Sequence, residues 1–198
     1  MHASERDTPG VQAERACYRD LSATLDLRRV KFIDESGINL AMTRLYGRAP
    51  RGERALGRAP QNYGQNVTIL GALSCTGLEA VMTIEGATDA DVFRAYVSEV
   101  LCPTLRGGDL VIADNLSAHK ATGVQEAIAA RGARLLSRPP YSPDLNPIER
   151  CWSKIKTCLR AAEARTHEAL DAAVTRALAT VTESDARAWF AHSGYVLH

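Results

Sequence analysis

The sequence predicts an α/β fold in which a mixed β-sheet is flanked by helices. Segments rich in β-forming residues gather between residues 66 and 86, and apolar strands alternate with amphipathic helices from residue 89 onward. That order is typical of a sheet with helices packed on it. No Pro- or Ser-rich linker divides the 198 residues, so the length fits one medium domain with extensions.

The first elements are short. Residues 11–27 are expected to form one helix, and VKFIDE at 30–35 predicts a strand that ends in acidic residues. The stretch that follows contains GRAP at 47–50 and again at 57–60, which is too few copies for a repeat architecture. Its Gly and Pro residues predict turns around a hairpin.

A second hairpin and a helix come next. NVTILGALSC at 66–75 and LEAVMTIEG at 78–86 are rich in β-branched residues and are expected to pair through a tight turn. A helix is predicted at about 89–101. Thr88 followed three residues later by Asp91 predicts a capping box at its start.

The rest of the chain alternates between strand and helix. Capping residues, apolar runs and Gly or Pro breaks set the expected boundaries. The predicted elements are a strand at 109–115, a helix at about 118–131, a strand at 133–140, a helix from Asn146 to about 161, and a final helix opened by Thr166. The final helix has an apolar stripe formed by Leu170, Val174, Leu178 and Val181.

The composition is that of an ordinary soluble globular protein. Apolar residues make up 45% and charged residues 24%, and the net charge of +1 does not by itself indicate a nucleic-acid-binding protein. Arg outnumbers Lys by 20 to 4. The planar guanidinium suits phosphate recognition, although an Arg- and Ala-rich chain also reflects genomic base composition.

The cysteines and the N-terminus argue against several classes of protein. The five cysteines include no Cys-x-x-Cys pair, which disfavours a zinc site or a disulfide framework. The first ten residues lack the apolar core of a signal peptide, and no apolar run approaches membrane-spanning length. We therefore expect a reducing, cytoplasmic location with no membrane contact.

Three acidic residues stand where folded chains place functional groups. Asp34 and Asp114 follow apolar strands, and Glu149 opens a helix. The carboxyl ends of strands form the usual ligand crevice of open α/β sheets. Carboxylates gathered there would repel one another without cations, and hard oxygen ligands suit Mg²⁺ or Mn²⁺. Two such ions can activate an attacking oxygen and stabilise a leaving oxygen at phosphorus.

Each acid also has a purely structural interpretation. Asp34 and Asp114 could simply end strands. Glu149 lies three residues after Asn146, with Pro147 between them, which is the spacing of a capping box. Considered alone, this local pattern favours a helix cap over a metal ligand.

Three blocks together carry a family resemblance. FIDESG, VIADNLSAHK and PPYSPDLNPIERCWSKIK occur in this order and resemble the signature blocks of the DDE-superfamily transposases, more narrowly the mariner-related transposases of bacterial insertion sequences. The separation of 35 residues between Asp114 and Glu149 matches that group. The resemblance implies a ribonuclease H-like fold in which Asp34, Asp114 and Glu149 form a catalytic triad that binds two Mg²⁺ or Mn²⁺ ions.

The resemblance also divides the chain. It covers about residues 30–160, which implies a catalytic domain at 30–161. Residues 1–29 are then a partly helical N-terminal extension. Residues 162–198 are expected to form C-terminal helices packed on the same domain.

Neighbours of the triad receive weaker assignments. Glu35 should face away from Asp34, because side chains alternate along a strand, and is the poorer candidate ligand. Asn115 is expected to orient Asp114 or to touch substrate. His119 matches a histidine of the second block and is expected to support the ligands or to contact DNA, although a lone His near a helix start is more often structural.

Two stretches are locally basic and are candidate DNA contacts. Each has a local charge of +4, and the usual explanation of such a short run is a solvated surface. The position of the second run beside Glu149 favours DNA, because a phosphate backbone would relieve repulsion between like charges four residues apart. The candidate residues are Arg44, Arg48, Arg51, Arg54 and Arg58 in the first stretch, and Arg150, Lys154, Lys156 and Arg160 in the second.

The predicted function is DNA transposition. By resemblance, the enzyme hydrolyses a phosphodiester at the element end and then uses the freed 3′-hydroxyl to attack target DNA. Two alternatives remain open: another ribonuclease H-like nuclease, or a catalytically inactive remnant that binds DNA or multimerises. A P-loop enzyme is disfavoured because the motif is missing.

The expected partners follow from the same resemblance. They are DNA, both element ends and target, and a second copy of the chain on that DNA. Mariner-related transposases also carry helix-turn-helix modules, whereas residues 1–29 offer at most one helix and their five acids balance five Arg. We therefore expect a helix-turn-helix half to be supplied upstream, and a nucleoid-associated location in a bacterium.

Overall fold

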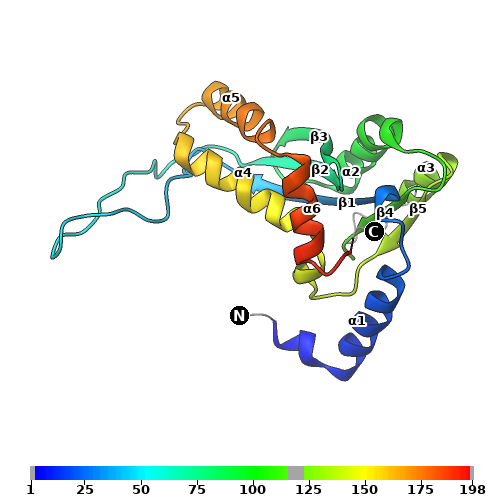
Figure 1. The fold of residues 1–198 in the computed structure, drawn as a ribbon. Helices are drawn as coiled ribbons and strands as arrows, with labels where there is room; N and C mark the ends of the chain where they lie inside the picture. The colour runs from blue at the N-terminus through cyan, green and yellow to red at the C-terminus, as the bar shows by residue number, and fades with distance from the viewer. Residues whose placement is uncertain (1–2, 116–122, 197–198) are drawn as a thin grey trace.

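The computed structural model describes residues 3–115 and 123–196, and this part of the chain contains a five-stranded mixed sheet with the order β3-β2-β1-β4-β5 (Figure 1). The central strand β1 pairs antiparallel with β2 and parallel with β4, and β4 pairs parallel with β5. The strands are β1 Val30–Ile38, β2 Val67–Ser74, β3 Gly77–Glu85, β4 Leu110–Ala113 and β5 Arg134–Ser137. The predicted mixed α/β sheet is confirmed.

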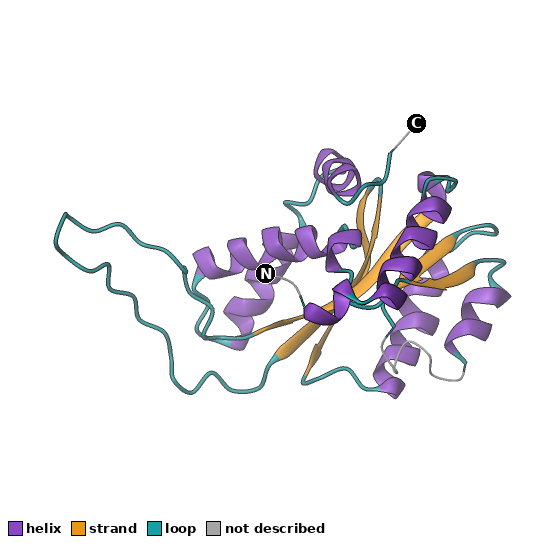
Figure 2. Ribbon diagram, turned by 90° about the horizontal axis from the view of Figure 1, so that it is seen from below, coloured by secondary structure: helices purple, strands orange, loops and turns teal. Residues whose placement is uncertain are grey.

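Helices cover both faces of the sheet (Figure 2). They are α1 Pro9–Ser22, α2 Ala90–Ala95, α3 Val124–Ala130, α4 Ile148–Ala162, α5 His167–Leu178 and α6 Glu183–His192. A π-helical segment, Tyr96–Leu101, continues α2. None of the helices in residues 3–115 and 123–196 is long and apolar enough to cross a bilayer.

Alternation along the strands divides the core into two layers. On one face, Phe32 of β1 contributes to a cluster that includes α4, α5 and α6. On the other face, Ile33 contributes to a cluster with α2, the π-helical segment and α3. The Phe32 ring lies 5.4 Å from the Phe190 ring and 5.1 Å from the Tyr195 ring. Side chains near the C-terminus therefore complete the core beside the central strand.

The strand that carries Asp34 is longer than predicted. Its parallel pairing with β4 ends at Phe32, opposite Ile112, but its antiparallel pairing with β2 continues to Ile38. The prediction of a strand ending at Asp34–Glu35 is therefore wrong. Asp34 lies instead just beyond the point where β1 stops pairing with β4.

Several helix boundaries also differ from the predictions. Asp89, not Thr88, caps α2, because its carboxylate accepts from the Asp91 and Val92 amides. Thr166 caps the following C-terminal helix as predicted, but that helix ends at Leu178 and a separate helix, α6, follows. The helix expected at 118–131 corresponds to α3, which begins at Val124 with Gly123 as its N-cap. Residues 116–122 lie outside the described part of the chain.

Residues 39–66 form a long loop between β1 and β2, which we call the arm. It projects away from the sheet in Figure 1 and contains no strand, so the hairpin predicted there is wrong. Tyr46 is 90% exposed and Leu56 is 93% exposed, which leaves the arm without a core to hold strands together. The Arg165 guanidinium anchors its root, donating to the Leu40, Met42 and Arg58 carbonyl oxygens at 2.9, 2.8 and 3.3 Å.

Candidate active site

Asp34 is the most strongly perturbed acid at the centre of the sheet. Its Oδ1 accepts from the Glu35 amide at 2.9 Å, and its Oδ2 accepts from Asn146 Nδ2 at 2.9 Å. Burial, followed by the negative charge of Glu149, raises the pKa of Asp34 to about 6. Asp114 acts in the same direction, whereas Arg138 opposes the shift. The three acids predicted to act together therefore influence one another electrostatically.

Asn146 does not cap the helix that follows it. Helix α4 begins at Ile148, and no side-chain hydrogen bond caps it. The Asn146 side chain is 1% exposed and is turned toward Asp34 instead, while its Oδ1 is buried without a partner. The predicted capping box is therefore wrong. The helix-start pattern conceals a residue that orients Asp34.

Asp114 and Glu149 line one open cavity of about 360 Å³. Asp114 directly follows β4, and Glu149 projects from the first turn of α4. Asn115 and Arg138 also line this cavity. The end of β4 and the segment from Arg138 to the start of α4 thus bring chemistry-bearing side chains to one hollow. Asp34 does not line this cavity, but Glu149 and Asp114 act on it electrostatically.

Packing of α4 on the sheet places Glu149. Gly71 of β2 pairs with Asp34, and a Cβ on Gly71 would lie 3.1 Å from the Trp152 ring. That close approach favours glycine, because a methyl group there would have to displace the Trp152 ring or the Leu78 side chain by a few tenths of an ångström. Trp152 is 3% exposed and lies one helical turn beyond Glu149, so its seat on Gly71 sets the position of the helix start.

Arg138 is a site residue that the sequence reasoning missed. It follows β5, is only 7% exposed, and donates from Nη1 to the Ser142 carbonyl oxygen at 3.1 Å. Its Nε is buried without a partner. A buried cation beside three carboxylates lowers their mutual repulsion. The available sequence signal is an arginine directly before Pro139-Pro140, at the end of the strand predicted at 133–140.

The carboxylate oxygens of the three acids suit divalent cations, although the side chains do not converge on a single point. Among residues 3–115 and 123–196, no group of three His, Cys, Asp or Glu side chains is arranged to hold a metal ion. The acids are nevertheless close enough for Glu149 and Asp114 to raise the pKa of Asp34. Carboxylate oxygens are the ligands of Mg²⁺ and Mn²⁺, and a cation between them would remove that repulsion.

The weaker neighbours are placed as follows. Glu35 follows Asp34 on β1 and, by strand alternation, shares the opposite face with Ile33. Only its backbone amide contacts Asp34. Asn115 is exposed at the cavity. His119 lies outside the described residues.

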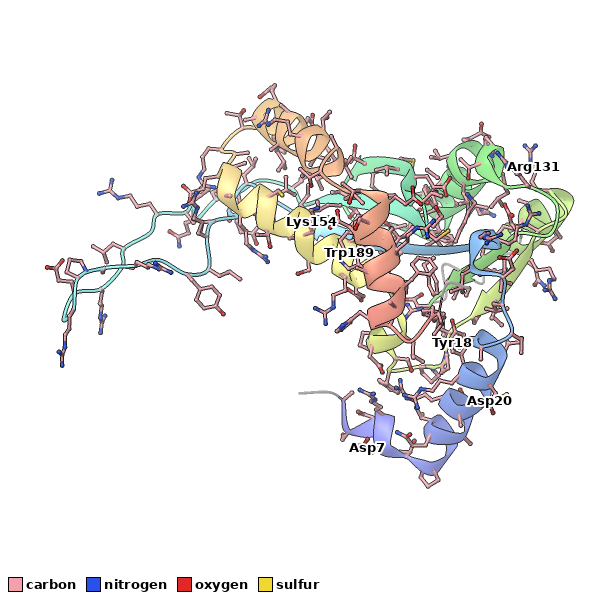
Figure 3. All side chains as sticks on the ribbon, viewed as in Figure 1. Asp7, Tyr18, Asp20, Arg131, Lys154 and Trp189 are labelled. Carbon is pink, nitrogen blue, oxygen red and sulfur yellow. The ribbon has the colours of Figure 1, made fainter. Side chains whose placement is uncertain are left out.

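The predicted basic residues fall into two groups. Every arginine of the arm is exposed, and side chains along the arm extend away from the domain (Figure 3). Lys156 and Arg160 of α4 line a cavity of about 300 Å³ at the root of the arm. These positions leave the guanidinium and ammonium groups accessible to a large anionic partner.

Two residues of the basic run contact other protein groups. Lys154 Nζ lies 2.6 Å from Asp185 Oδ2 and donates to the Thr180 carbonyl oxygen at 2.8 Å, so it ties α4 to α6. Arg150 contacts the His192 ring. The DNA contact predicted for Lys154 stays a prediction, and in this structure Asp185 pairs with its ammonium group.

Comparison with known proteins identifies the family. Residues 29–171 match the model described as "DDE superfamily endonuclease". The chain belongs to this family. The match includes Asp34, Asp114 and Glu149 within a single stretch, and it ends inside α5.

Two curated relatives of this DDE superfamily endonuclease come from Caenorhabditis briggsae. The Tcb2 transposable element transposase is 30% identical over 105 residues, and the Tcb1 transposase is 31% identical over 105 residues. Each match covers 51% of this chain and 38% of the relative, so the chain matches well under half the length of either. The kinship with mariner-type transposases is confirmed, but these relatives are nematode elements rather than bacterial insertion sequences.

Solved structures confirm the ribonuclease H-like fold. The catalytic domain of Mos1 mariner transposase superposes with a TM-score of 0.69 at 14% identity, covering 98% of this chain and 89% of that one. The Mos1 paired-end complex with Mn gives a TM-score of 0.73 at 15% identity, covering 100% of this chain and 61% of that one. At these identities the likeness concerns the fold alone.

Proposed function

We propose that this chain is the catalytic domain of a transposase that cleaves DNA strands at element ends and joins them to target DNA. The observation that carries the proposal is that Asp114 and Glu149 line one cavity and that the charges of both act on the carboxylate of Asp34. Burial, followed by the charges of Glu149 and Asp114, raises the pKa of Asp34, and a divalent cation would relieve the repulsion between the acids.

The three carboxylates are proposed as ligands of two Mg²⁺ or Mn²⁺ ions. When bound, the ions supply activation of the attacking oxygen and stabilisation of the leaving oxygen. Asn146 holds the Asp34 carboxylate in one orientation through the 2.9 Å hydrogen bond. Arg138 offsets the negative charge and offers a guanidinium to a phosphate oxygen in the cavity. The related structures with Mn and Mg are those of Mos1.

The proposed DNA surface consists of the arm and the adjoining face of α4. Exposed arginines on a long loop suit contacts with backbone phosphates rather than with base edges. The proposed contacts are Arg44, Arg48, Arg51, Arg54 and Arg58 of the arm, and Arg150, Lys156 and Arg160 of α4. Asn115 and His119 are retained as candidates for substrate contact, and Glu35 as an indirect support of Asp34.

Assembly is part of the same proposal. Residues 30–161 form the catalytic unit, 1–29 extend it, and the C-terminal helices pack on it. We propose a homodimer on DNA, by analogy with the paired-end complexes described for Mos1. We further propose that a helix-turn-helix segment outside these 198 residues reads the element ends, and that the protein is nucleoid-associated in a bacterium.

The test is metal-dependent cleavage of element-end duplex by the wild-type chain and three near-isosteric variants. Asp34→Asn, Asp114→Asn and Glu149→Gln should each lower the cleavage rate by at least about a hundredfold in Mg²⁺ or Mn²⁺. Arg187→Ala, which changes a surface ion pair on α6, serves as the control. The helix-turn-helix half is added in trans.

Three outcomes separate the alternatives. Cleavage without joining to a target plasmid indicates a nuclease. DNA binding without metal-dependent cleavage indicates an inactive remnant. Wild-type activity in any one triad variant removes that residue from the site.

A further inference from the structure

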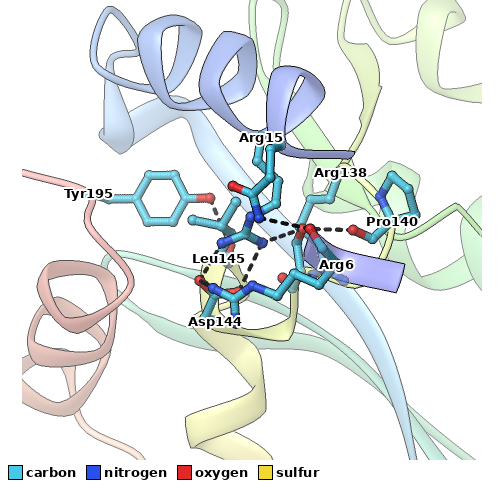
Figure 4. Close-up of polar contacts among 9 residues, drawn as sticks. Arg6, Arg15, Arg138, Pro140, Asp144, Leu145 and Tyr195 are labelled. Carbon is cyan, nitrogen blue, oxygen red and sulfur yellow. Dashed lines mark hydrogen bonds and ion pairs between the residues drawn. The ribbon is translucent and has the colours of Figure 1, made fainter. Parts of the chain in front are cut away.

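Helix α1 reaches the active site through one buried arginine, Arg15. Its side chain is 1% exposed, and it forms a two-point ion pair with Asp144, from Nη1 to Oδ1 at 3.1 Å and from Nη2 to Oδ2 at 2.7 Å (Figure 4). Nη1 also donates to Ser142 Oγ at 2.6 Å. These partners lie 127 and 129 residues away along the chain, in the loop between β5 and α4.

That loop depends on contacts from outside itself. Tyr141 adopts a left-handed conformation with φ of 53°, which is unfavourable for a bulky residue. Within the loop, Ser142 Oγ donates to the Pro140 carbonyl oxygen at 2.9 Å. The Tyr195 hydroxyl donates to the Leu145 carbonyl oxygen at 2.8 Å. A strained segment persists only where its surroundings over-determine it. Arg15 of α1 supplies the buried two-point contact, beside Arg138 on the Ser142 carbonyl oxygen and Arg6 on Asp144.

The loop ends on the residue that orients Asp34. The backbone amide of Asn146 donates to the Pro143 carbonyl oxygen at 3.0 Å. The backbone amide of Glu149 donates to the backbone carbonyl oxygen of Asn146 at 3.2 Å. The Asn146 side chain then bonds Asp34. A shift of the turn around Asp144 therefore moves both the partner of Asp34 and the helix start that carries Glu149.

We propose that Arg15 is a positioning residue of the active site: through Asp144 and Ser142 it holds the loop that presents Asn146 to Asp34. This rests on the proposed metal-dependent function. Only the Arg15 side of this pair is buried, since the Asp144 side chain is 39% exposed. Taking a guanidinium out of water costs free energy that such an ion pair only partly offsets, so stability alone does not explain Arg15. A guanidinium fork aimed at two polar groups of one turn instead specifies where that turn lies.

The first measurement does not depend on activity. The Asn146 side-chain amide is followed by ¹H–¹⁵N NMR in the metal-free chain, with its signals assigned by their loss in Asn146→Ala. Arg15→Met should shift or broaden these signals, because the hydrogen bond to Asp34 is no longer held. Asp144→Asn, which is close to isosteric but removes the charge and one acceptor of the two-point contact with Arg15, should produce the same change.

The second measurement concerns metal and catalysis. Arg15→Met should raise the Mn²⁺ concentration for half-maximal cleavage by about tenfold and lower kcat, with the KM for DNA unchanged. Arg15→Lys should recover only part of this, since an ammonium cannot form the two-point contact. The control is Arg6→Ala, which removes the outer ion pair with Asp144 at 3.0 Å and leaves Arg15 in place.

The outcomes are distinguishable. Unchanged Asn146 signals in folded Arg15→Met would overturn the positioning role, whatever the wild type does to DNA. If Arg15→Met fails to fold, Asp144→Asn answers the same question. A further outcome is that Arg15→Met shows the expected NMR change while the wild-type chain shows no metal-dependent cleavage. That combination would support the positioning role of Arg15 and contradict the proposed function.

Discussion

Asp34 shows how a single residue can oppose folding while serving a site. The pKa of Asp34 is about 6 in the folded chain and 3.8 as its ordinary value. Between these two pH values, the folded chain keeps the proton of Asp34, whereas the unfolded chain has lost it. Stability therefore falls as pH rises from about 4 to about 6, and the full cost of the charged carboxylate is present above that range. Burial and the charges of Glu149 and Asp114 are the cause.

Asp34→Asn should therefore stabilise the metal-free chain. We expect a gain of roughly 1–3 kcal/mol at pH 7.5 and almost none at pH 3.5, because the neutral amide has no charge to desolvate. Asn146 can turn its buried Oδ1 toward the new amide, so the contact is kept. The measurement is urea unfolding in EDTA at both pH values. A destabilised variant at pH 7.5 would contradict this account of Asp34.

Helix α4 illustrates the element scale, because two of its lysines, two residues apart, have different surroundings. Lys154 is paired with Asp185 on α6, whereas Lys156 faces the cavity at the root of the arm. The hydrogen bond from Lys154, followed by those from the Thr182 hydroxyl and amide, lowers the pKa of Asp185 to about 2. That pair therefore contributes stability above pH 4, which is lost as pH falls toward 2.

The two lysines should separate stability from DNA binding. Lys154→Ala should lower the free energy of unfolding by about 1 kcal/mol at pH 7, with the deficit disappearing near pH 2. Lys156→Ala should leave stability unchanged and reduce the log–log salt slope of DNA binding by about 0.9 for one lost phosphate contact. Thermal unfolding and binding titrations at several salt concentrations measure both. The reverse assignment of the two effects would return Lys154 to the DNA surface.

At the scale of the whole molecule, the C-terminal helices and the arm differ in how much of their apolar surface is buried in the core. Phe190 and Tyr195 pack against Phe32 on the central strand, so α6 belongs to the main core. The arm leaves that core between β1 and β2 and exposes its apolar side chains. Removing segments of similar length from these two places should therefore have unequal effects.

Truncation after Leu178 should abolish the cooperative unfolding transition, because it uncovers the Phe32 face of the sheet. Replacing 46–62 by a short Gly-Ser linker should keep a single transition within a few degrees of wild type, since the loss involves exposed side chains. Scanning calorimetry of both variants provides the comparison. Two separate transitions in the intact chain would show that 162–198 fold as an independent unit.

The sequence by itself determined the strand and helix succession and the positions of three acids. β-Branched runs, Thr166 as a cap and the apolar stripe of the C-terminal helix all act through neighbours within a few residues, so their patterns are readable without a fold. The signature blocks also placed Asp114 directly after a strand and Glu149 in the first turn of a helix, as observed, whereas Asp34 lies inside β1. Local physics is sufficient where the partner is local.

Only the tertiary structure decided which side chains meet. Asn146 reads as a helix cap but bonds Asp34, 112 residues away. Lys154 reads as a DNA contact but pairs with Asp185, and Arg15 carries no local signal at all for its partner Asp144. A polar side chain binds the best partner that packing brings within about 3 Å, and that partner is set by how distant elements stack. The identity of the acids is therefore written in the sequence, whereas their orientation is a property of the folded chain.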